Sequence, residues 1–212
     1  MNHYISGCAL HSVKPLEGGF EGELVESAFA SCLEKANAGT VPFRLRLARK
    51  EDLEAMTGLV QGLADYCQES DAVHMKASDY VQDGFDLNEP LWYCIMVDTE
   101  DADGNSCACG YAFVFVGYIL GEGRFLYLED LYLEVEHRGR GGGSLVMQSL
   151  AGLSRAINCK RLYWQALDWN ESGLSFYNNI GAKIHHGEKT SRYATTALVQ
   201  FAENGAKSKT KN

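Results

Sequence analysis

The chain has 212 residues, of which 46% are hydrophobic and 22% are charged. Such values are ordinary for a globular protein, and the length predicts one domain with a sizeable core. The formal net charge of −9 argues against nonspecific nucleic-acid binding, which depends on clustered Lys and Arg. An acidic surface is compatible with a cationic substrate, although it is also common among soluble proteins.

The cysteine and histidine patterns predict no metal site. Seven cysteines are present, and the close pair Cys107-Ala-Cys109 is neither a CxxC redox motif nor a zinc-ligand pattern. The adjacent His185 and His186 lack a third ligand at metal spacing. No apolar run reaches the roughly 18 residues of a membrane span, and the N-terminus lacks an apolar signal region. The sequence therefore predicts a cytoplasmic protein with reduced thiols and no membrane partner.

The first predicted element is an amphipathic helix over residues 23–38, within an N-terminal extension that covers residues 1–42. The apolar positions near one face of this helix are Leu24, Phe29, Cys32 and Leu33. The domain proper is predicted over residues 43–202, and the polar tail 203–212 is predicted to be disordered.

Within the domain, apolar alternation predicts strands and a period of 3.6 residues predicts helices. The predicted strands are 43–47, 92–97, 110–119, 125–134 and 161–167. The predicted helices are 51–67, 78–83 with Ser78 as N-cap, 144–157, and 173–180 with Gly181 at the C′ position. Residues 182–201 are predicted to hold the last strands. The early strands follow one another and the later ones alternate with helices, which predicts a mixed α/β sheet.

A glycine-rich turn joins a strand to a helix at residues 138–143, with the sequence RGRGGG. Glycines allow a tight bend that brings several N–H groups close to a ligand, and the helix N-terminus adds the positive end of its dipole. Two arginines are predicted to flank these amides. The turn therefore predicts a site for a phosphate-bearing ligand, although an ordinary strand–helix connection stays open for the hexapeptide alone.

Several phosphate-binding motifs fit this turn poorly. A P-loop needs GxxxxGK[ST], and no lysine follows these glycines. A dinucleotide-binding GxGxxG motif that starts at Gly139 would place Ser144 at its third glycine, and the next acidic residue is Asp168, beyond the following strand. An RGG-type RNA contact would need repetition and a basic neighbourhood, and the sequence has neither. The spacing Arg-x-x-Gly-x-Gly is satisfied.

This spacing resembles the pyrophosphate-binding motif of the GNAT superfamily of acetyltransferases, which cradle coenzyme A. Over residues 43–182 the chain resembles the diamine (spermidine/spermine) acetyltransferases and their thialysine-acetylating relatives. The matching segments are LADY at 63–66, DYVQDGF at 79–85, WYCIMV at 92–97, YLEDLYLE at 127–134, RGRGGGS at 138–144 and DWNESGLSFYNNIGA at 168–182. The resemblance implies a GNAT-type α/β (α+β) fold, with a mixed, mainly antiparallel central sheet flanked by helices. It also implies acetyl-CoA as cofactor, a small-molecule amine as substrate, and a homodimer.

Acetyl transfer to an amine requires a group that removes a proton from the nucleophile. A primary alkyl amine has a pKa near 10.4, so only roughly one molecule in a thousand is uncharged at neutral pH. Glu129 and Asp130 are adjacent on the strand before the turn, and strand alternation predicts that they point to opposite faces. The resemblance implies that Glu129 anchors the amine and acts as base through a water molecule. Pairing of both carboxylates with arginines is the structural alternative.

The resemblance implies that Tyr177 protonates the departing thiolate, although a core position for its ring stays open. Asn170 would hydrogen-bond the pantetheine or cap the helix that holds Tyr177. Backbone groups of three strand residues would pair with the pantetheine amides, and one N–H would polarise the thioester carbonyl. The implied cofactor-binding residues are Leu131, Tyr132, Leu133, Arg138, Gly139, Arg140, Gly141, Gly142, Gly143, Ser144, Asn170 and Tyr177.

For the acceptor amine, the implied residues are Tyr66, Cys67, Glu129, Tyr163, Trp164 and Gln165. Cys67 stands where diamine acetyltransferases place a glutamate, which favours a thialysine-like or other amino-acid amine over spermidine. A covalent acetyl-cysteine route is less favoured, because Cys67 and Cys159 have no evident histidine partner. A protein or peptide N-acetyltransferase and a catalytically silent coenzyme A sensor are the alternative functions. The presence of Glu129 and Tyr177 argues against a silent sensor.

Overall fold

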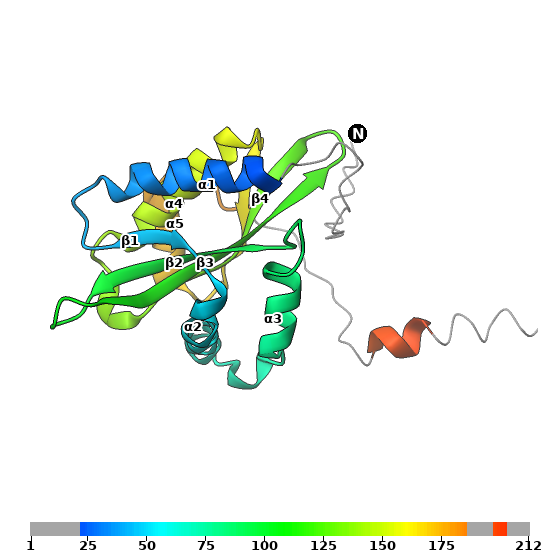
Figure 1. The fold of residues 1–212 in the computed structure, drawn as a ribbon. Helices are drawn as coiled ribbons and strands as arrows, with labels where there is room; N and C mark the ends of the chain where they lie inside the picture. The colour runs from blue at the N-terminus through cyan, green and yellow to red at the C-terminus, as the bar shows by residue number, and fades with distance from the viewer. Residues whose placement is uncertain (1–21, 186–196, 203–212) are drawn as a thin grey trace, which may run out of the picture. The chain divides into compact units, whose positions relative to one another are not determined.

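The computed structural model describes residues 22–185 and 197–202 of the chain (Figure 1). The chain divides into two compact units, Met1–Leu167 and Asp168–Asn212. The tail 203–212 lies outside the described residues, as do residues 1–21 of the predicted extension. None of the described helices is both long enough and apolar enough to span a bilayer.

The first unit is built on a sheet whose described strands have the order β1-β2-β3-β4-β5. Their bounds are Arg44–Leu47, Tyr93–Glu100, Ser106–Ile119, Gly123–Leu133 and Arg161–Trp164. Neighbouring strands are antiparallel except β4 and β5, which are parallel. The parallel pair is joined by a helical crossover, which parallel strands require. The predicted mixed, mainly antiparallel sheet is therefore confirmed.

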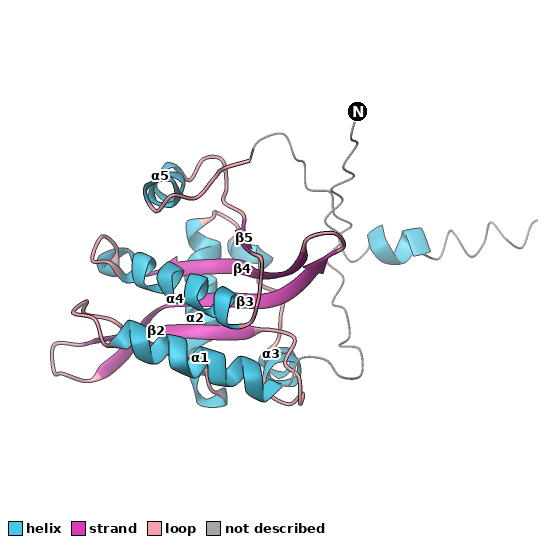
Figure 2. Cartoon of the chain, turned by 90° about the horizontal axis from the view of Figure 1, so that it is seen from above, coloured by secondary structure: helices cyan, strands magenta, loops and turns pink. Residues whose placement is uncertain are grey.

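Helices cover both faces of this sheet (Figures 1 and 2). In the first unit they are α1 (Gly22–Asn37), α2 (Leu53–Tyr66), α3 (Ala77–Gly84) and α4 (Gly142–Ala156), with short 3₁₀ turns η1 (Lys50–Asp52), η2 (Ser70–Ala72) and η3 (Val135–His137). Helices α1 and α4 pack on each other and against one face, and α2 contacts β3 and β4 on the other face. The two faces therefore have separate cores.

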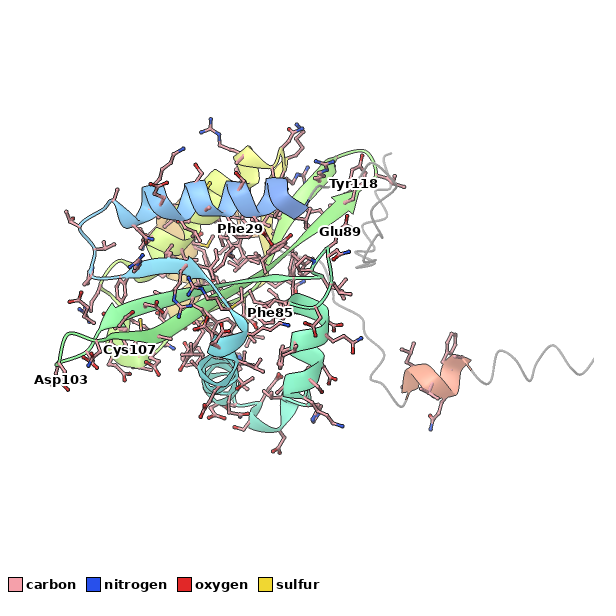
Figure 3. All side chains as sticks on the ribbon, viewed as in Figure 1. Phe29, Phe85, Glu89, Asp103, Cys107 and Tyr118 are labelled. Atoms are coloured by element: carbon pink, nitrogen blue, oxygen red, sulfur yellow. The ribbon has the colours of Figure 1, made fainter. Side chains whose placement is uncertain are left out.

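Helix α1 belongs to the core of the first unit, although the sequence analysis assigned it to an extension. Its buried side chains are Val25, Phe29 and Leu33. Phe29 points from α1 toward the sheet, where its ring centroid lies 4.9 Å from that of Tyr93 (Figure 3). At the end of α1, the Asn37 side chain accepts from the Leu45 N–H at 2.7 Å and donates to the Leu45 carbonyl at 2.8 Å. The side chain of Leu24 lies outside the described part.

On the opposite face, α2 covers an aromatic and sulfur-rich core. The buried members of this cluster are Met56, Leu59, Trp92, Cys94, Met96 and Tyr111. Gly84 of α3 is required for this packing, because a Cβ there would lie 2.1 Å from the Trp92 ring. Arg46 of β1 pairs with Asp98 of β2 at 2.5 Å and with Asp52 at 2.6 Å. These ion pairs fix the start of α2 to the edge of the sheet.

Several predicted boundaries differ from the observed ones. Helix α3 begins at Ala77, with Lys76 rather than Ser78 as N-cap, because the Asp79 carboxylate accepts the Lys76 N–H at 3.1 Å. The hairpin of β2 and β3 is longer than predicted. Its turn, with Asp103 at the tip in Figure 3, is closed by Asp101, whose carboxylate accepts backbone N–H groups of Asp103 and Asn105. Side-chain bonds of this kind are not visible in apolar periodicity.

The second unit contains α5 (Glu171–Asn179). Gly181 follows it with a φ of 86°, its N–H donates to the Asn178 carbonyl, and the Ala182 N–H donates to the Tyr177 carbonyl. This is the Schellman arrangement, so the predicted C′ glycine is confirmed. Of the predicted last strands, 186–196 lie outside the described residues. Residues 197–202 are helical rather than extended, since a short apolar run fits either structure.

Candidate active site

Strand β4 contains a β-bulge at Glu129. Phe113 of β3 faces Asp130, but the next residue, Val114, faces Leu128, so Glu129 has no partner on β3. An inserted residue shifts the alternation of side chains along a strand. Simple alternation therefore does not fix the relative orientation of Glu129 and Asp130, and their opposite orientation stays a prediction. Desolvation, followed by the charge of the adjacent Asp130, raises the pKa of Glu129.

Asp130 lies on the α2 face, next to residues that the sequence analysis did not select. The Tyr111 hydroxyl donates to the Asp130 carboxylate at 3.0 Å. Burial raises the pKa of Asp130, and the bond from Tyr111 partly opposes this rise. Burial followed by the charge of Asp130 also raises the pKa of Tyr80. Tyr111 is thus the positioning partner of this carboxylate, and no sequence motif marked it.

Glu129 is available to bind a cation. Its side chain reaches solvent, and within the described part of the chain it forms neither a hydrogen bond nor an ion pair. Surrounding protein removes part of the water that would stabilise its charge, so desolvation, followed by the charge of Asp130, raises its pKa. A carboxylate whose pKa lies closer to neutrality is a better general base. The predicted alternative, pairing with arginine, is not observed for either carboxylate in the described part.

The thiol of Cys67, at the end of α2, lies within reach of this acidic group. Burial, followed by the charges of Glu69 and Asp130, raises its pKa. The thiol is therefore protonated at neutral pH and is a poor nucleophile. That the reaction does not pass through an acetyl-cysteine stays a prediction.

The glycine turn has the backbone geometry of an anion site. Gly139 and Gly141 have φ values of 72° and 93°, in the left-handed region that favours glycine. Helix α4 begins at Gly142, and its first hydrogen bond runs from the Leu145 N–H to the Gly141 carbonyl. The N–H groups of residues 142–144 therefore have no acceptor within the helix. Together with the helix dipole, these donors fit a diphosphate.

Small residues are required where this turn meets the α1 face. A Cβ on Gly141 would lie 3.2 Å from Val41. A Cβ on Gly142 would lie 3.2 Å from both Leu133 and Phe43. A side chain at either position would need its neighbours to move, so the turn is built for close backbone approach.

The two arginines of the turn have different surroundings. Arg140 is exposed, with its guanidinium 5.5 Å from the Phe43 ring centroid. Arg138 instead lies over the Tyr66 ring at 4.5 Å, and its Nε donates to the Leu133 carbonyl at 2.8 Å. Arg138 thus contacts an aromatic ring and a strand carbonyl, and the expectation that both cations flank the turn amides stays a prediction.

Beyond Leu128, the edge of β4 that faces β5 is open within the described part. Pairing with β5 ends at Leu128 and Trp164, whereas pairing with β3 continues to Leu133. The Glu134 N–H donates to the Cys109 carbonyl, toward β3. Because backbone groups alternate along a strand, those of Tyr132 also face β3, and those of Leu131 and Leu133 face the open edge. Two of the three predicted residues can thus pair with an extended ligand.

The predicted acceptor residues do not form one cluster. Tyr163 and Trp164 are consecutive on β5 and lie opposite Tyr127 and Leu128, so they occupy different faces of the sheet. The Tyr163 hydroxyl accepts from Arg161 at 2.6 Å. Gln165 follows the strand and is exposed.

The remaining predicted residues, Asn170 and Tyr177, belong to the second unit. The Asn170 side chain accepts the Gly173 N–H at 3.0 Å and so caps α5, as the structural alternative expected. The Tyr177 ring centroid lies 5.2 Å from that of Phe176, and burial raises the pKa of its hydroxyl.

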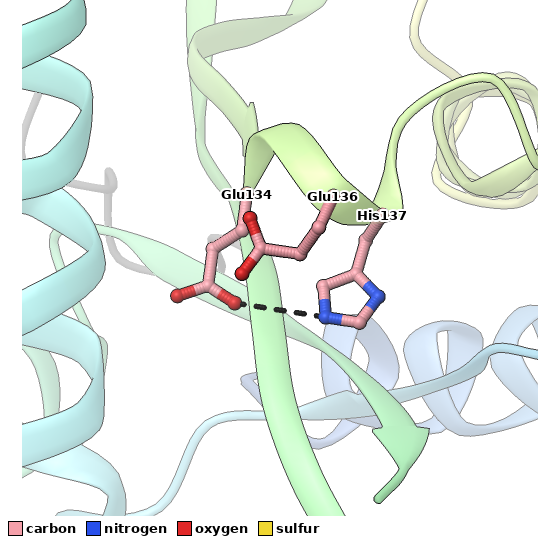
Figure 4. Close-up of side chains that lie close together, drawn as sticks. All are labelled: Glu134, Glu136 and His137. Carbon is pink, nitrogen blue, oxygen red and sulfur yellow. Dashed lines mark ion pairs between the residues drawn. The ribbon is translucent and has the colours of Figure 1, made fainter.

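A group of possible cation ligands lies in η3 and at its N-cap, just before the glycine turn (Figure 4). Ligand atoms of Glu134, Glu136 and His137 lie within 4.8 Å of one another. Glu134 and His137 already approach at 3.8 Å, and Arg140 Nη1 lies 3.4 Å from the other ring nitrogen of His137. A nearby guanidinium disfavours a bound cation, so these contacts describe a surface turn and we assign no metal to it.

Comparison with known proteins places this geometry in a family. A model of the acetyltransferase (GNAT) family matches residues 56–182. The chain belongs to the GNAT family. Among curated relatives, thialysine N-epsilon-acetyltransferase of Bos taurus is 31% identical over 142 residues, which are 66% of this chain and 83% of the relative. Spermidine/spermine N(1)-acetyltransferase-like protein 1 of Homo sapiens is 29% identical over 142 residues, 66% of this chain and 20% of the relative.

Solved structures show the same fold. An integron cassette protein from the mobile metagenome of V. cholerae aligns with a TM-score of 0.60 at 21% identity, over 77% of this chain and 99% of that one. The predicted GNAT fold and the resemblance to diamine and thialysine acetyltransferases are thus confirmed. The protein is an N-acetyltransferase.

Proposed function

We propose that the protein transfers the acetyl group of acetyl-CoA to a primary amine of a small polyamine-like or amino-acid-like molecule, by direct attack in a ternary complex. The observation that carries the proposal is the bulge at Glu129, where a carboxylate without an ion pair in the described residues adjoins the half-buried Asp130, just as the open edge of β4 begins. A cationic amine requires such charge, and an extended acyl carrier requires such an edge.

The turn and the open edge fit coenzyme A. The free N–H groups of residues 142–144 would hold its diphosphate, with Arg140 beside them, and Gly139 and Gly141 permit the bend. Backbone groups of Leu131 and Leu133 would pair with its amides, and one of these N–H groups would stabilise the oxyanion. When bound, the cofactor supplies an activated acyl carbon.

The acidic pair would prepare the amine. Glu129 binds the ammonium and accepts its proton, directly or through water, so that the nitrogen can attack. Asp130 adds a second negative charge and is held by Tyr111. Because its carboxylate already accepts the Tyr111 hydroxyl, Asp130 would shape the electrostatic environment of the amine, and Glu129 would be the base.

The thiolate that leaves requires a proton, and the family motif assigns this role to Tyr177. Replacement by phenylalanine removes one hydroxyl and little binding surface. We therefore expect Tyr177→Phe to lower kcat by about two to three orders of magnitude with less than about a twofold change in acetyl-CoA affinity. Stopped-flow turnover and calorimetric titration measure the two quantities, and unchanged kcat across the pH range would remove Tyr177 from this role.

The named relatives act on thialysine or carry a spermidine/spermine name. In this chain Cys67 replaces the glutamate expected for a diamine, which favours a molecule with one terminal amine and an amino-acid end over spermidine. The acidic residues Glu69 and Asp71 follow in η2 and its approach, and they are exposed. They could attract a second cationic group.

A thiol-release assay tests the proposal. Acetyl-CoA is offered with thialysine, lysine, ornithine, putrescine, spermidine and a panel of lysine and N-terminal peptides, and products are identified by mass spectrometry. We expect turnover with small amines and the highest kcat/KM for an amino-acid amine. Preference for peptides would indicate a protein N-acetyltransferase, and tight coenzyme A binding without turnover would indicate a sensor.

The resemblance also leads us to propose a homodimer in the cytoplasm. Sedimentation velocity of the full chain would show a single species of twice the chain mass. A monomer at all concentrations would contradict the assembly.

A further inference from the structure

We propose that Arg138 positions the acceptor side of the active site, and is not a ligand of the cofactor's diphosphate. This inference rests on the proposed function. It concerns the first residue of the Arg-x-x-Gly-x-Gly motif, which pattern alone would assign to the phosphate. The structure gives the side chain a different set of contacts.

The Arg138 guanidinium is held on the α2 side of the turn. Its central carbon lies 4.5 Å from the Tyr66 ring centroid and 5.6 Å from that of Tyr132. A planar guanidinium combines stacking on aromatic faces with directed N–H donors, which an ammonium cannot do. The side chain is thus fixed between the last residue of α2 and the end of β4.

The second contact of Arg138 lies at the end of the open edge of β4. Its Nε donates to the Leu133 carbonyl at 2.8 Å, and this carbonyl faces away from β3. An extended ligand that pairs along Leu131 and Leu133 would therefore meet Arg138 at the end of the edge. The Nε–H group of Arg138 is already used in this bond, and one face of its guanidinium is covered by Tyr66. Less of the guanidinium is therefore left to bind a phosphate.

Tyr132 extends the same contact onto α2. A Cβ on Gly62 would lie 2.8 Å from the Tyr132 hydroxyl, so this ring lies directly against the α2 backbone. Burial raises the pKa of Tyr132, and the charge of Arg138 partly opposes this rise. Three elements therefore meet at Arg138: the end of β4, the start of the glycine turn, and the last turn of α2.

The consequence concerns the acceptor amine. Tyr66 is the last residue of α2, and it leads into Cys67 and the acidic residues that follow. Cys67 lies near Asp130, whose charge contributes to its raised pKa. By fixing Tyr66, Arg138 sets the distance between the end of α2 and the β4 edge that would hold the acyl carrier. Loss of Arg138 should loosen acceptor binding more than cofactor binding.

The test uses two acyl donors and the variant Arg138→Lys, which keeps the charge but not the planar stack. We expect the KM of the best amine to rise about tenfold, with a change of less than about twofold in acetyl-CoA affinity. The same rise should occur when acetyl-pantetheine, which lacks the diphosphate, replaces acetyl-CoA. If Arg138→Lys weakened the binding of acetyl-CoA but not that of acetyl-pantetheine, Arg138 would be a phosphate ligand and the proposal would be overturned.

Arg140→Lys is the matched control, because Arg140 is an exposed arginine of the same turn whose guanidinium lies over the Phe43 ring. Arg140→Lys should weaken the binding of acetyl-CoA and leave the binding of acetyl-pantetheine unchanged. We therefore expect Arg138→Lys to change mainly the KM of the amine and Arg140→Lys to change mainly the affinity for acetyl-CoA. Equal effects of both variants on acetyl-CoA affinity would contradict it.

A readout without turnover separates this inference from the proposed function. Thermal unfolding of Arg138→Lys, Tyr66→Leu and the double variant reports whether the two side chains interact. We expect the Tm of the double variant to match that of the less stable single variant, since one broken stack removes both contributions. Additive losses of Tm would overturn the inference. An absence of acetyl transfer to every amine would sink the proposed function alone.

Discussion

The two faces of β4 are made of different residue types, although they belong to one eleven-residue strand. Toward α1 and α4 the strand presents the leucines at 126, 128, 131 and 133. Toward α2 it presents Tyr127, Asp130 and Tyr132, with Glu129 in the bulge. The leucine side chains contribute apolar burial, which is nearly complete at 126 and 128 and partial at 131 and 133, and the other face holds a half-buried carboxylate that accepts a hydrogen bond from Tyr111. Stability and chemistry are therefore assigned to opposite sides of the same backbone.

The largest effect that would sharpen this comparison is expected at Glu129. Glu129→Gln keeps the shape of the side chain and removes the base, so kcat should fall by about 10²- to 10⁴-fold. Stability should change little, because the side chain reaches solvent and makes no ion pair within the described residues. Steady-state kinetics and chemical denaturation measure the two quantities.

Leu126→Ala is the control on the leucine face. Leu126 is fully buried, so truncation should lower the free energy of unfolding by about 2 to 5 kcal/mol while leaving turnover per folded molecule unchanged. If Glu129→Gln destabilised the fold as much as Leu126→Ala, or Leu126→Ala abolished turnover of folded protein, the division between the faces would be lost.

The next effect concerns the glycine turn. Valine at Gly141 would have to adopt a φ of 93° and would press on Val41, so Gly141→Val should cost about 1 to 3 kcal/mol of stability. It should also weaken acetyl-CoA binding by about tenfold or more, since misplaced amides no longer converge. Calorimetric titration measures this affinity.

Gly121→Val is matched in backbone strain, because Gly121 has a φ of 92° and a Cβ there would meet nothing within 4 Å. It lies at the β3–β4 hairpin, close in sequence to Tyr118, which Figure 3 shows at the end of that hairpin. We expect a loss of stability without a loss of acetyl-CoA affinity. Equal loss of affinity in both variants would mean that strain, and not a local anion site, explains the result.

The smallest expected effect is a shift in pH dependence. The charge of Asp130 contributes to the raised pKa of Glu129, so Asp130→Asn removes a like charge and should lower that pKa. Glu129 would then be deprotonated at lower pH, and the acidic limb of the kcat/KM profile should move to lower pH. A shift toward higher pH would show that the two carboxylates do not interact as described.

The bulge in β4 is visible in the sequence as a change in the spacing of its leucines. The leucines of β4 stand at even positions up to 128 and at odd positions from 131, and this change of phase is the signature of the inserted residue. The main strands, the helix after the glycine turn and the C′ glycine that ends α5 were predictable, because each follows a local sequence pattern.

Other features could not be predicted from such patterns. A motif specifies the position of Arg138 along the chain, but its rotamer depends on Tyr66, which lies more than seventy residues earlier. The same holds for the contact of Asn37, at the end of α1, with Leu45 of β1 and for that of Tyr111 on β3 with Asp130 on β4, because each forms only when two separate elements pack together. Tertiary contacts of this kind decide the site, and local sequence does not encode them.

Residue-resolved amide hydrogen exchange with and without coenzyme A tests the central claim most directly. If the cofactor lies along the open edge of β4 with its diphosphate on the first amides of α4, exchange should slow at Leu131, Leu133 and residues 142–144. The amide of Tyr132, which faces β3, should be unaffected. Saturating coenzyme A that leaves all of these amides unchanged, or that protects a different region instead, would contradict the account.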